Sequence, residues 1–228
     1  MIGPSVVLGE GTRDKKFLEE LCAARGIAGH VMSEVESNAN FGKYIQAISA
    51  QTNFLHTCKA ILIVSDSDES QPDSFKFIKK QLNDIGYPSP AYPLEIAKKK
   101  DMPSVAVVML PYPVVNGITE GCLETVLIPA MESANCAQAA CVDQMLACVN
   151  VAAWPKKSSR DKAKVRCLIS AVWSDDPMKG LQWCYGSNMG LIPLGHAAFD
   201  GLADILSNFP AWAASDLKTW AEWKAKNP

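Results

Sequence analysis

The sequence predicts an α/β fold in which a mostly parallel sheet is flanked by helices and continued by a helical C-terminal elaboration. Two uninterrupted apolar runs, at residues 59–65 and 104–110, are typical of strands that a parallel sheet buries on both faces. Amphipathic helical patterns lie before and between these runs. Strands that alternate with helices indicate a doubly wound layer, because parallel strands need a crossover connection.

The first half of the chain supplies this layer in order. A short apolar run at 5–9 predicts the first strand. Phe17 and Leu21 then lie at helical spacing in a segment that Gly26 terminates. The elements expected next are a helix over 13–25, a strand within 28–34, an amphipathic helix over 41–55, the strand at 59–65, a helix from Pro72 to Gly86 and the strand at 104–110.

After about residue 117 the apolar pattern is helical, and we expect no further strand. Three tryptophans in the last segment suit a terminal helix or turn that docks through its indole rings. We expect a single domain over 1–228, with an α/β core over 1–117 and a mostly helical elaboration over 118–228 packed on it. The expected C-terminal helices cover 120–131, 134–153, 159–173, 178–185 and 197–209, followed by the terminal segment 210–226.

The amino-acid composition excludes several classes of protein. The chain has 228 residues, 48% of them hydrophobic, which suits a packed core and excludes a disordered chain. A net charge of −2 and a pI near 5.9 exclude a basic coat, so any contact with DNA or RNA would use a local patch. No apolar run approaches the ~20 residues of a membrane span, and the N-terminal segment does not resemble a signal peptide, so we expect no membrane contact.

The eight cysteines do not indicate a metal site or a disulfide framework. No CxxC pair occurs, and the three histidines are far from any zinc-ligand spacing. Most of the cysteines fall on apolar positions of helical patterns, where a free thiol packs as a small hydrophobe. We therefore expect free cysteines and a reducing, cytoplasmic location.

Acidic residues gather where the predicted strands end. Glu10 follows the first strand, and Asp14 comes four residues later, where one helical turn can bring both carboxylates together. Asp66 and Asp68 close the central strand, and extended geometry would place both side chains on one side of it. The pattern therefore predicts four carboxylates at one edge of the sheet.

A third acidic pair, Glu120 and Glu124, follows the last strong strand, again four residues apart at an expected helix start. Ligands of an open parallel sheet bind outside the carboxyl ends of its strands, so these six acids would meet there. Crowded carboxylates repel one another unless some stay protonated or a cation joins them. All-oxygen ligands favour Mg²⁺ or Mn²⁺, and two such ions could serve a phosphoryl displacement.

Four segments resemble one family. VLGEGTRD at 7–14 looks like the EGxxD strand–helix opening of Toprim-type domains, and IVSDSD at 63–68 resembles their DxD strand. The segment VAVVMLPYPVVNGITEGCLETVL at 105–127 is similar to the MP…G.LE..L stretch of small Toprim-like proteins akin to the overcoming-lysogenization-defect (OLD) nucleases. DKAKVR at 161–166 looks like the Lys-Ala-Lys helix of those proteins, so the resemblance spans roughly residues 5–209.

This resemblance implies a Toprim-like (Rossmann-like) fold and a metal-dependent phosphotransfer site. By position, Asp66 and Asp68 match the DxD metal ligands, and Glu10 matches a glutamate that acts as a metal ligand or as a general acid/base. Asp14 matches the second acid of the opening motif, and Glu124 matches the late LE glutamate. Glu120 has no firm counterpart. The sequence contains no GxxxxGK[ST] motif, so it differs from OLD nucleases in carrying no ATPase module of that type.

The basic residues allow two interpretations each. Lys162 and Lys164 stand at an expected helix start, where either could neutralise charge on a phosphate as a catalytic residue, or form a solvated face. Lys98, Lys99 and Lys100 precede the last strand and could follow a nucleic-acid backbone, or serve only solubility.

The sequence therefore predicts divalent-metal-dependent phosphodiester hydrolysis on nucleic acid, by a nuclease or nicking enzyme with Mg²⁺ or Mn²⁺ as cofactor. The alternative is a non-catalytic Toprim-like module that binds a nucleotide or a protein partner, for example in a defence system. A nucleotide-sugar transferase stays open, whereas an aspartyl-phosphate phosphatase expects an aspartate where Glu10 stands. The Ala- and Cys-rich helix over 134–153 suits either the core or the interface of a homo-oligomer.

Overall fold

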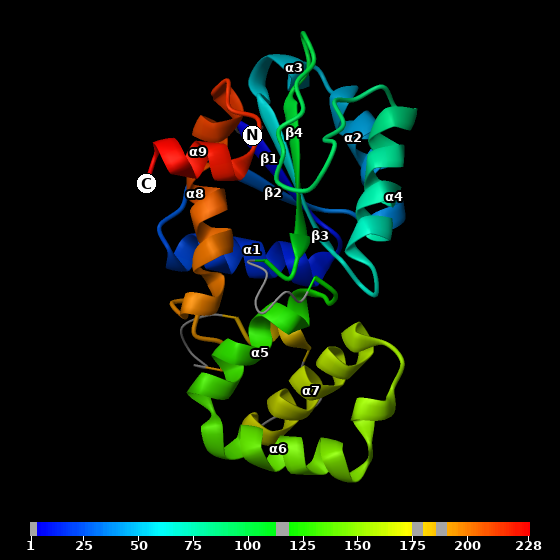
Figure 1. Cartoon of the computed structure of the whole chain (residues 1–228). Coiled ribbons are helices and arrows are strands. Elements are labelled where there is room, and N and C mark those ends of the chain that lie inside the picture. Colours follow the sequence, from blue (N-terminus) through cyan, green and yellow to red (C-terminus); the bar gives the residue numbers. More distant parts are fainter. Residues whose placement is uncertain (1–3, 113–118, 175–179, 186–190) are drawn as a thin grey trace.

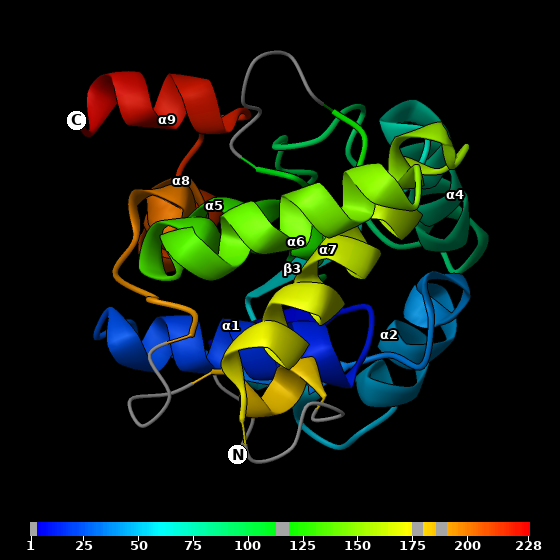
Figure 2. The same cartoon turned by 90° about the horizontal axis from the view of Figure 1, so that it is seen from below.

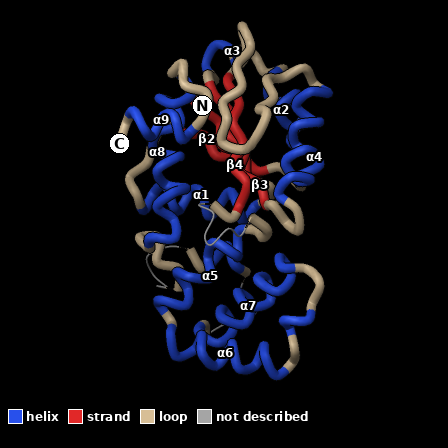
Figure 3. The backbone as a smooth tube through the Cα atoms, in the orientation of Figure 1, coloured by secondary structure: helices blue, strands red, loops and turns tan. Residues whose placement is uncertain are grey.

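The computed structural model describes residues 4–112, 119–174, 180–185 and 191–228, and it confirms the α/β class. Within these residues, four strands form one sheet in the order β2-β1-β3-β4, and all neighbouring pairs are parallel (Figure 3). The parallel order is Rossmann-like, as the alternation of strands and helices predicts. The strands are β1 (Ser5–Gly9), β2 (His30–Glu34), β3 (Ala60–Asp66) and β4 (Ser104–Leu110).

Helices cover both faces of the sheet (Figure 1). The alternation of side chains along a strand decides which face each residue joins, so Val7 of β1 packs into one hydrophobic cluster and its neighbours Val6 and Leu8 into the other. Both clusters are apolar throughout, which explains why the strands are apolar runs without alternation. The first face is covered by α1 (Thr12–Ala24) and α8 (Asp200–Ala214), and the second by α2 (Phe41–Ser49) and α4 (Gln71–Asp84).

Three further helices lie beyond the carboxyl ends of the strands (Figure 1). Seen from that side, they stand in front of the sheet (Figure 2). We call them the annex: α5 (Leu123–Ala134), α6 (Cys136–Cys148) and α7 (Lys157–Val172). α7 packs against both α5 and α6, so the three helices form one group.

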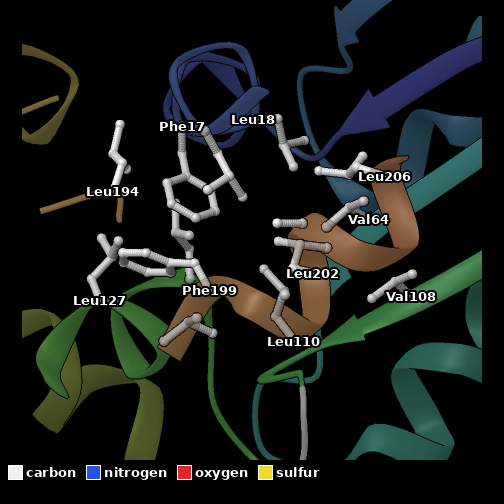
Figure 4. Packing of buried hydrophobic residues seen from close by; sticks show 14 of the residues in the cluster. Phe17, Leu18, Val64, Val108, Leu110, Leu127, Leu194, Phe199, Leu202 and Leu206 are labelled. Atoms are coloured by element: carbon white, nitrogen blue, oxygen red, sulfur yellow. The ribbon is translucent and has the colours of Figure 1, made fainter. Parts of the chain in front are cut away.

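The chain then returns to the sheet through α8, which packs against α1. Phe17 of α1 meets Phe199, just before α8, with ring centroids 5.4 Å apart (Figure 4). The terminal helix α9 (Trp220–Lys226) docks by its indole rings, as expected, because Trp220 and Trp223 are both buried. The described C-terminal half is helical, but α8 belongs to the layer beside the sheet rather than to the annex.

Two predicted helices end earlier than their apolar patterns suggest. The helix expected over 41–55 is divided into α2 and a short α3 (Phe54–Thr57), because Asn53 adopts a left-handed backbone with φ of 68°. The helix expected over 134–153 ends at Cys148 for the same reason, since Asn150 has φ of 55°. A 3₁₀ turn, Val151–Ala153, follows.

Two other C-terminal predictions are wrong. Pro210 does not begin a new segment but lies inside α8, where the buried side chains of Phe209 and Trp212 hold the helix together around it. The helix expected over 178–185 is absent from the described part of that range, which holds only a 3₁₀ turn at Leu181–Trp183, and residues 178–179 lie outside the described residues. The remaining 3₁₀ turns are Asn38–Asn40 and Ala197–Phe199.

All eight cysteines are free, as expected, but only half of them are buried. Cys136, Cys141 and Cys148 are exposed on α6, which corrects the expectation that most of the cysteines pack as small hydrophobes. In the described parts of the chain, no helix has both the length and the apolar character needed to cross a membrane.

Candidate functional site

Five of the six predicted acids line one pocket of about 460 Å³ at the carboxyl edge of the sheet. The direction of the strands explains this, because the carboxyl ends of parallel β1 and β3 lie side by side and each is followed by acids. α1 and α5 add one acid each from their first turns. The five are Glu10, Asp14, Asp66, Asp68 and Glu124.

Glu10 ties the end of β1 to the end of β3. Its Oε2 atom accepts hydrogen bonds from the Ser65 hydroxyl at 3.2 Å and from the backbone N–H of Asp66 at 3.1 Å. The preceding Gly9 lets α1 start at once, since a Cβ atom there would stand 2.9 Å from the Cβ atom of Asp14. The sequence Gly-Glu-Gly therefore places a strand end, a glutamate and a helix start against one another.

Asp66 connects the sheet to the annex. Its Oδ1 atom accepts a hydrogen bond of 2.8 Å from the backbone N–H of Leu123, the first residue of α5. A carboxylate at this position satisfies an otherwise unpaired N–H group and lies at the positive end of the helix. The last residue of the central strand thus fixes where α5 begins.

Asp68 reaches the pocket by a different route from the one its sequence pattern predicts. The residue is not extended, because its φ is 49°, in the left-handed region. Its backbone is held by reciprocal hydrogen bonds with Gly121, with N···O distances of 2.7 and 2.8 Å. Both aspartates of the DxD motif line the pocket, although alternation along a strand is not the cause.

The pair Glu120 and Glu124 is split by the structure. α5 begins at Leu123, so Glu120 is not one helical turn before Glu124, and it is exposed outside the pocket. Gly121, whose positive φ of 137° favours glycine, pairs its backbone with that of Asp68. Glu124 itself is buried, and its Oε1 atom lies 3.8 Å from Nη1 of Arg13.

The crowded acids hold their protons more strongly than isolated carboxyls. Burial, followed by the charges of Glu10 and Glu124, raises the pKa of Asp14 to about 7. Burial and the neighbouring carboxylates, Asp14 first among them, raise the pKa of Asp66 well above its ordinary value. Burial also raises the pKa of Glu10, against the lowering effect of the hydrogen bond from Asp66. At neutral pH the pocket therefore keeps some of its carboxyls protonated.

Lys162 and Arg13 are the cations among the described residues that line the pocket. Burial works to lower the pKa of Lys162, but the anionic groups around it, including Asp66 and Glu124, outweigh that effect and raise it. Lys164 does not line the pocket. Its ammonium group pairs with Glu132 of α5 and Asp143 of α6, each at 2.5 Å, so it joins the annex helices to one another.

The three lysines expected to follow a nucleic acid lie at the opposite edge of the sheet, because they precede β4. The Nζ atom of Lys98 donates to the carbonyl of Ser215, and that of Lys99 donates to the carbonyl of Gly86 at 2.7 Å. Lys100 is exposed. The structure therefore does not bring these lysines to the acidic pocket.

Glu69, which sequence reasoning did not select, holds the annex from the DxD side. Its carboxylate accepts hydrogen bonds from the backbone N–H of Lys157 at 3.1 Å and from the Ser158 hydroxyl at 2.7 Å. These two residues form the first turn of α7, the helix that carries Lys162. Arg13 was missed as well, although its place between the two acids of the opening motif was a signal in the sequence.

The donor set of the pocket fits a hard divalent cation in chemical type, because it consists of carboxylate oxygens. Burial and neighbouring carboxylates raise the pKa of Asp14 and of Asp66, as expected where negative charge is crowded. In the described parts of the chain, no three His, Cys, Asp or Glu side chains already form a ligand group for one ion. Binding of an ion would therefore require the carboxylates to turn toward it.

Fold and pocket together define an α/β protein with a parallel, Rossmann-like sheet and an acidic pocket at its carboxyl edge. The sequence profile of a family described as a protein of unknown function (DUF3226) matches residues 4–212, and the chain belongs to this family. No curated protein and no solved structure matches the chain.

Proposed function

We propose that this protein is a divalent-metal-dependent phosphodiesterase that acts on nucleic acid, with a site of the Toprim type. The observation that carries the proposal is the collection of six carboxylates in one open pocket with two cations: the five predicted acids and Glu36, an exposed acid that the sequence pattern did not single out. The pKa values of Asp14 and Asp66 are raised. Structural carboxylates are normally paired or exposed, so an excess of buried negative charge in a pocket points to a ligand that supplies positive charge.

The Toprim resemblance supports the same conclusion. The residues that carry the resemblance, Glu10, Asp14 and the two aspartates of the DxD motif, are residues that line the pocket. The residue with no counterpart in the resemblance, Glu120, lies outside it. For these acids the motif and the geometry agree, whereas Lys164 of the DKAKVR segment lies outside the pocket.

Asp66, Asp68 and Glu10, with Asp14 or Glu124, would hold one or two Mg²⁺ or Mn²⁺ ions. Such ions polarise a phosphate and lower the pKa of bound water. Asp14, whose pKa is about 7 without a bound ion, would lose its proton as an ion binds beside it. The ammonium group of Lys162 would stabilise the negative charge that develops on the phosphate.

A cleavage assay tests this function. The full chain is incubated with supercoiled plasmid and with single-stranded DNA and RNA in Mn²⁺, in Mg²⁺ and in EDTA. We expect nicking or cleavage with Mn²⁺, none with EDTA, and loss of activity in Asp68→Asn, since Asn also tolerates the left-handed backbone at this position.

Asp73→Asn is the matched control, because Asp73 is an exposed acid in the first turn of α4, outside the pocket. Wild-type protein that binds Mn²⁺ but leaves all of these substrates intact would contradict the nuclease proposal. That result would favour the second candidate, a module that binds a nucleotide or a partner without turnover. The absence of a preformed ligand group among the described residues is the observation on the side of this candidate.

A further inference from the structure

Arg13 lies on the wall of the acidic pocket that α1 forms. It is the second residue of α1, and its side chain is 48% exposed. Its Nη1 atom is 3.8 Å from Oε1 of Glu124, a separation at which two charges attract but which is longer than a hydrogen bond. This contact leaves the planar array of guanidinium donors available to another acceptor.

The two cations of the pocket come from different parts of the molecule. Arg13 belongs to α1, beside the sheet, and Lys162 belongs to α7, in the annex. The carboxylates of the same pocket would repel a phosphate unless a cation neutralised them. A negatively charged substrate therefore needs the acids to be neutralised, and can then meet one cation from α1 and one from α7.

Neutralisation would also change what Arg13 contacts. The buried carboxylate of Glu124 attracts the guanidinium. A divalent ion held by the acids supplies that positive charge instead, so the attraction between Arg13 and Glu124 weakens. A phosphate group offers two oxygens at the spacing of the guanidinium fork, which matches it better than a single carboxylate oxygen at 3.8 Å.

Resting on the proposed function, we propose that Arg13 binds a phosphate of the substrate, and that the site recognises the phosphate backbone of a polynucleotide rather than its bases. No aromatic side chain is found among the described residues that line the pocket, so the pocket itself offers no surface on which a base could stack. Recognition then depends on charge and on the fork geometry of Arg13, both of which are independent of base sequence.

Binding measured without cleavage tests this inference. Fluorescein-labelled single strands of about 12 nucleotides, one of oligothymidine and one of mixed sequence, are titrated with protein in Ca²⁺ by fluorescence anisotropy. We expect Arg13→Ala to raise Kd at least about tenfold, and Arg13→Lys to recover only part of the loss because lysine keeps the charge and loses the fork. Wild-type Kd should agree within about twofold between the two strands.

Lys16→Ala is the control, because Lys16 lies one turn further along α1 and pairs with Glu20 at 2.6 Å instead of lining the pocket. It should leave Kd within about twofold of wild type, and thermal unfolding should show that each variant folds. Arg13→Ala should also reduce the slope of log K against log salt by about one phosphate contact.

The outcomes separate this inference from the proposed function. If Arg13→Ala binds the strands as wild type does, while the wild type still cleaves with Mn²⁺, the role of Arg13 is wrong and the phosphodiesterase stands. If the wild type prefers one strand by more than about tenfold, recognition of the backbone alone is wrong. If the wild type neither binds nor cleaves any of the strands, the proposed function fails together with the inference.

Discussion

Polar groups are paired with one another at the amino edge of the sheet, whereas acidic groups are crowded together at its carboxyl edge. At the amino edge, the His30 ring is satisfied on both sides, with Nδ1 at 2.7 Å from the Ser5 hydroxyl and Nε2 at 2.7 Å from the carbonyl of Leu206. Burial lowers the pKa of His30, which favours the neutral ring that this arrangement suits. At the carboxyl edge, by contrast, six carboxylates share a pocket with two cations.

This difference indicates where the function of the molecule lies. Evolution and packing normally leave buried polar groups paired, as at the amino edge. An edge where the pKa of Asp66 is raised well above its ordinary value holds charge that the folded chain does not neutralise by itself. Such an imbalance is expected where a ligand completes the site.

Asp66→Asn should have the largest effect, and its effects on function and on stability should differ. The amide oxygen can still accept the hydrogen bond from Leu123, so the start of α5 is retained. We expect nuclease activity to fall by roughly 10²-fold or more. The midpoint of thermal unfolding without metal should stay the same or rise, since a buried carboxyl crowded by other acids is replaced by an amide that cannot ionise. A large fall in the unfolding midpoint without metal would show that Asp66 has a structural role, and that the carboxyl edge is like the amino edge in this respect.

The stability of the metal-free protein should fall as pH rises. The pKa of Asp14 is about 7 in the folded protein against an ordinary value of 3.8, so between these values the folded state binds more protons than the unfolded state. We expect the free energy of unfolding in EDTA to decrease between pH 4 and 7, on the order of 2–4 kcal/mol in total. Urea unfolding across this range checks it, and saturating Mn²⁺ should remove the decrease.

Glu69→Ala should have a smaller effect on stability and on cleavage, because Glu69 holds the first turn of α7. Removal of this carboxylate leaves the backbone N–H of Lys157 and the hydroxyl of Ser158 without their partner. We expect a loss of about 0.5–1 kcal/mol in unfolding free energy, at the low end for a helix cap because solvent screens the site. Cleavage should slow as well, because α7 positions Lys162. Asp84→Ala, which removes an exposed ion pair with Lys80, is the control and should change neither property.

Replacing Lys98, Lys99 and Lys100 together by alanine should have the smallest effect. These lysines lie at the amino edge, where at least two of them donate to backbone carbonyls. We expect the Kd for single-stranded DNA to change by less than about twofold. A change as large as that of Arg13→Ala would show that nucleic acid also contacts the amino edge, as the lysine run alone suggests.

The strands and the convergence of the acids could be predicted, because both follow from local pattern and strand direction. The end of β3 is apparent in the change from apolar residues to Asp66, and parallel strands place such ends together. Strand direction also predicts the position of Lys98: this residue precedes β4 and therefore lies at the amino edge of the sheet. The position of Glu120 outside the pocket could not be predicted from local sequence. It depends on backbone pairing between Gly121 and Asp68, which are more than fifty residues apart.

Long-range packing accounts for the other differences. Nothing near Glu69 in the sequence shows that it caps a helix that begins 88 residues later. Pro210 is locally a helix breaker, yet α8 continues through it because Phe209 and Trp212 are buried on the same packed face. In both cases the local pattern was outweighed by contacts that only the folded chain provides.

Proton release on Mn²⁺ binding tests most directly whether the carboxyl edge is completed by a cation. Isothermal titration at pH 6.5 in two buffers of different ionisation enthalpy gives the number of protons released per ion. Since the pKa of Asp14 is about 7 and that of Asp66 is raised, we expect roughly one proton to leave as Mn²⁺ binds, and fewer in Asp66→Asn. Binding without proton release, or no binding at millimolar Mn²⁺, would contradict the account.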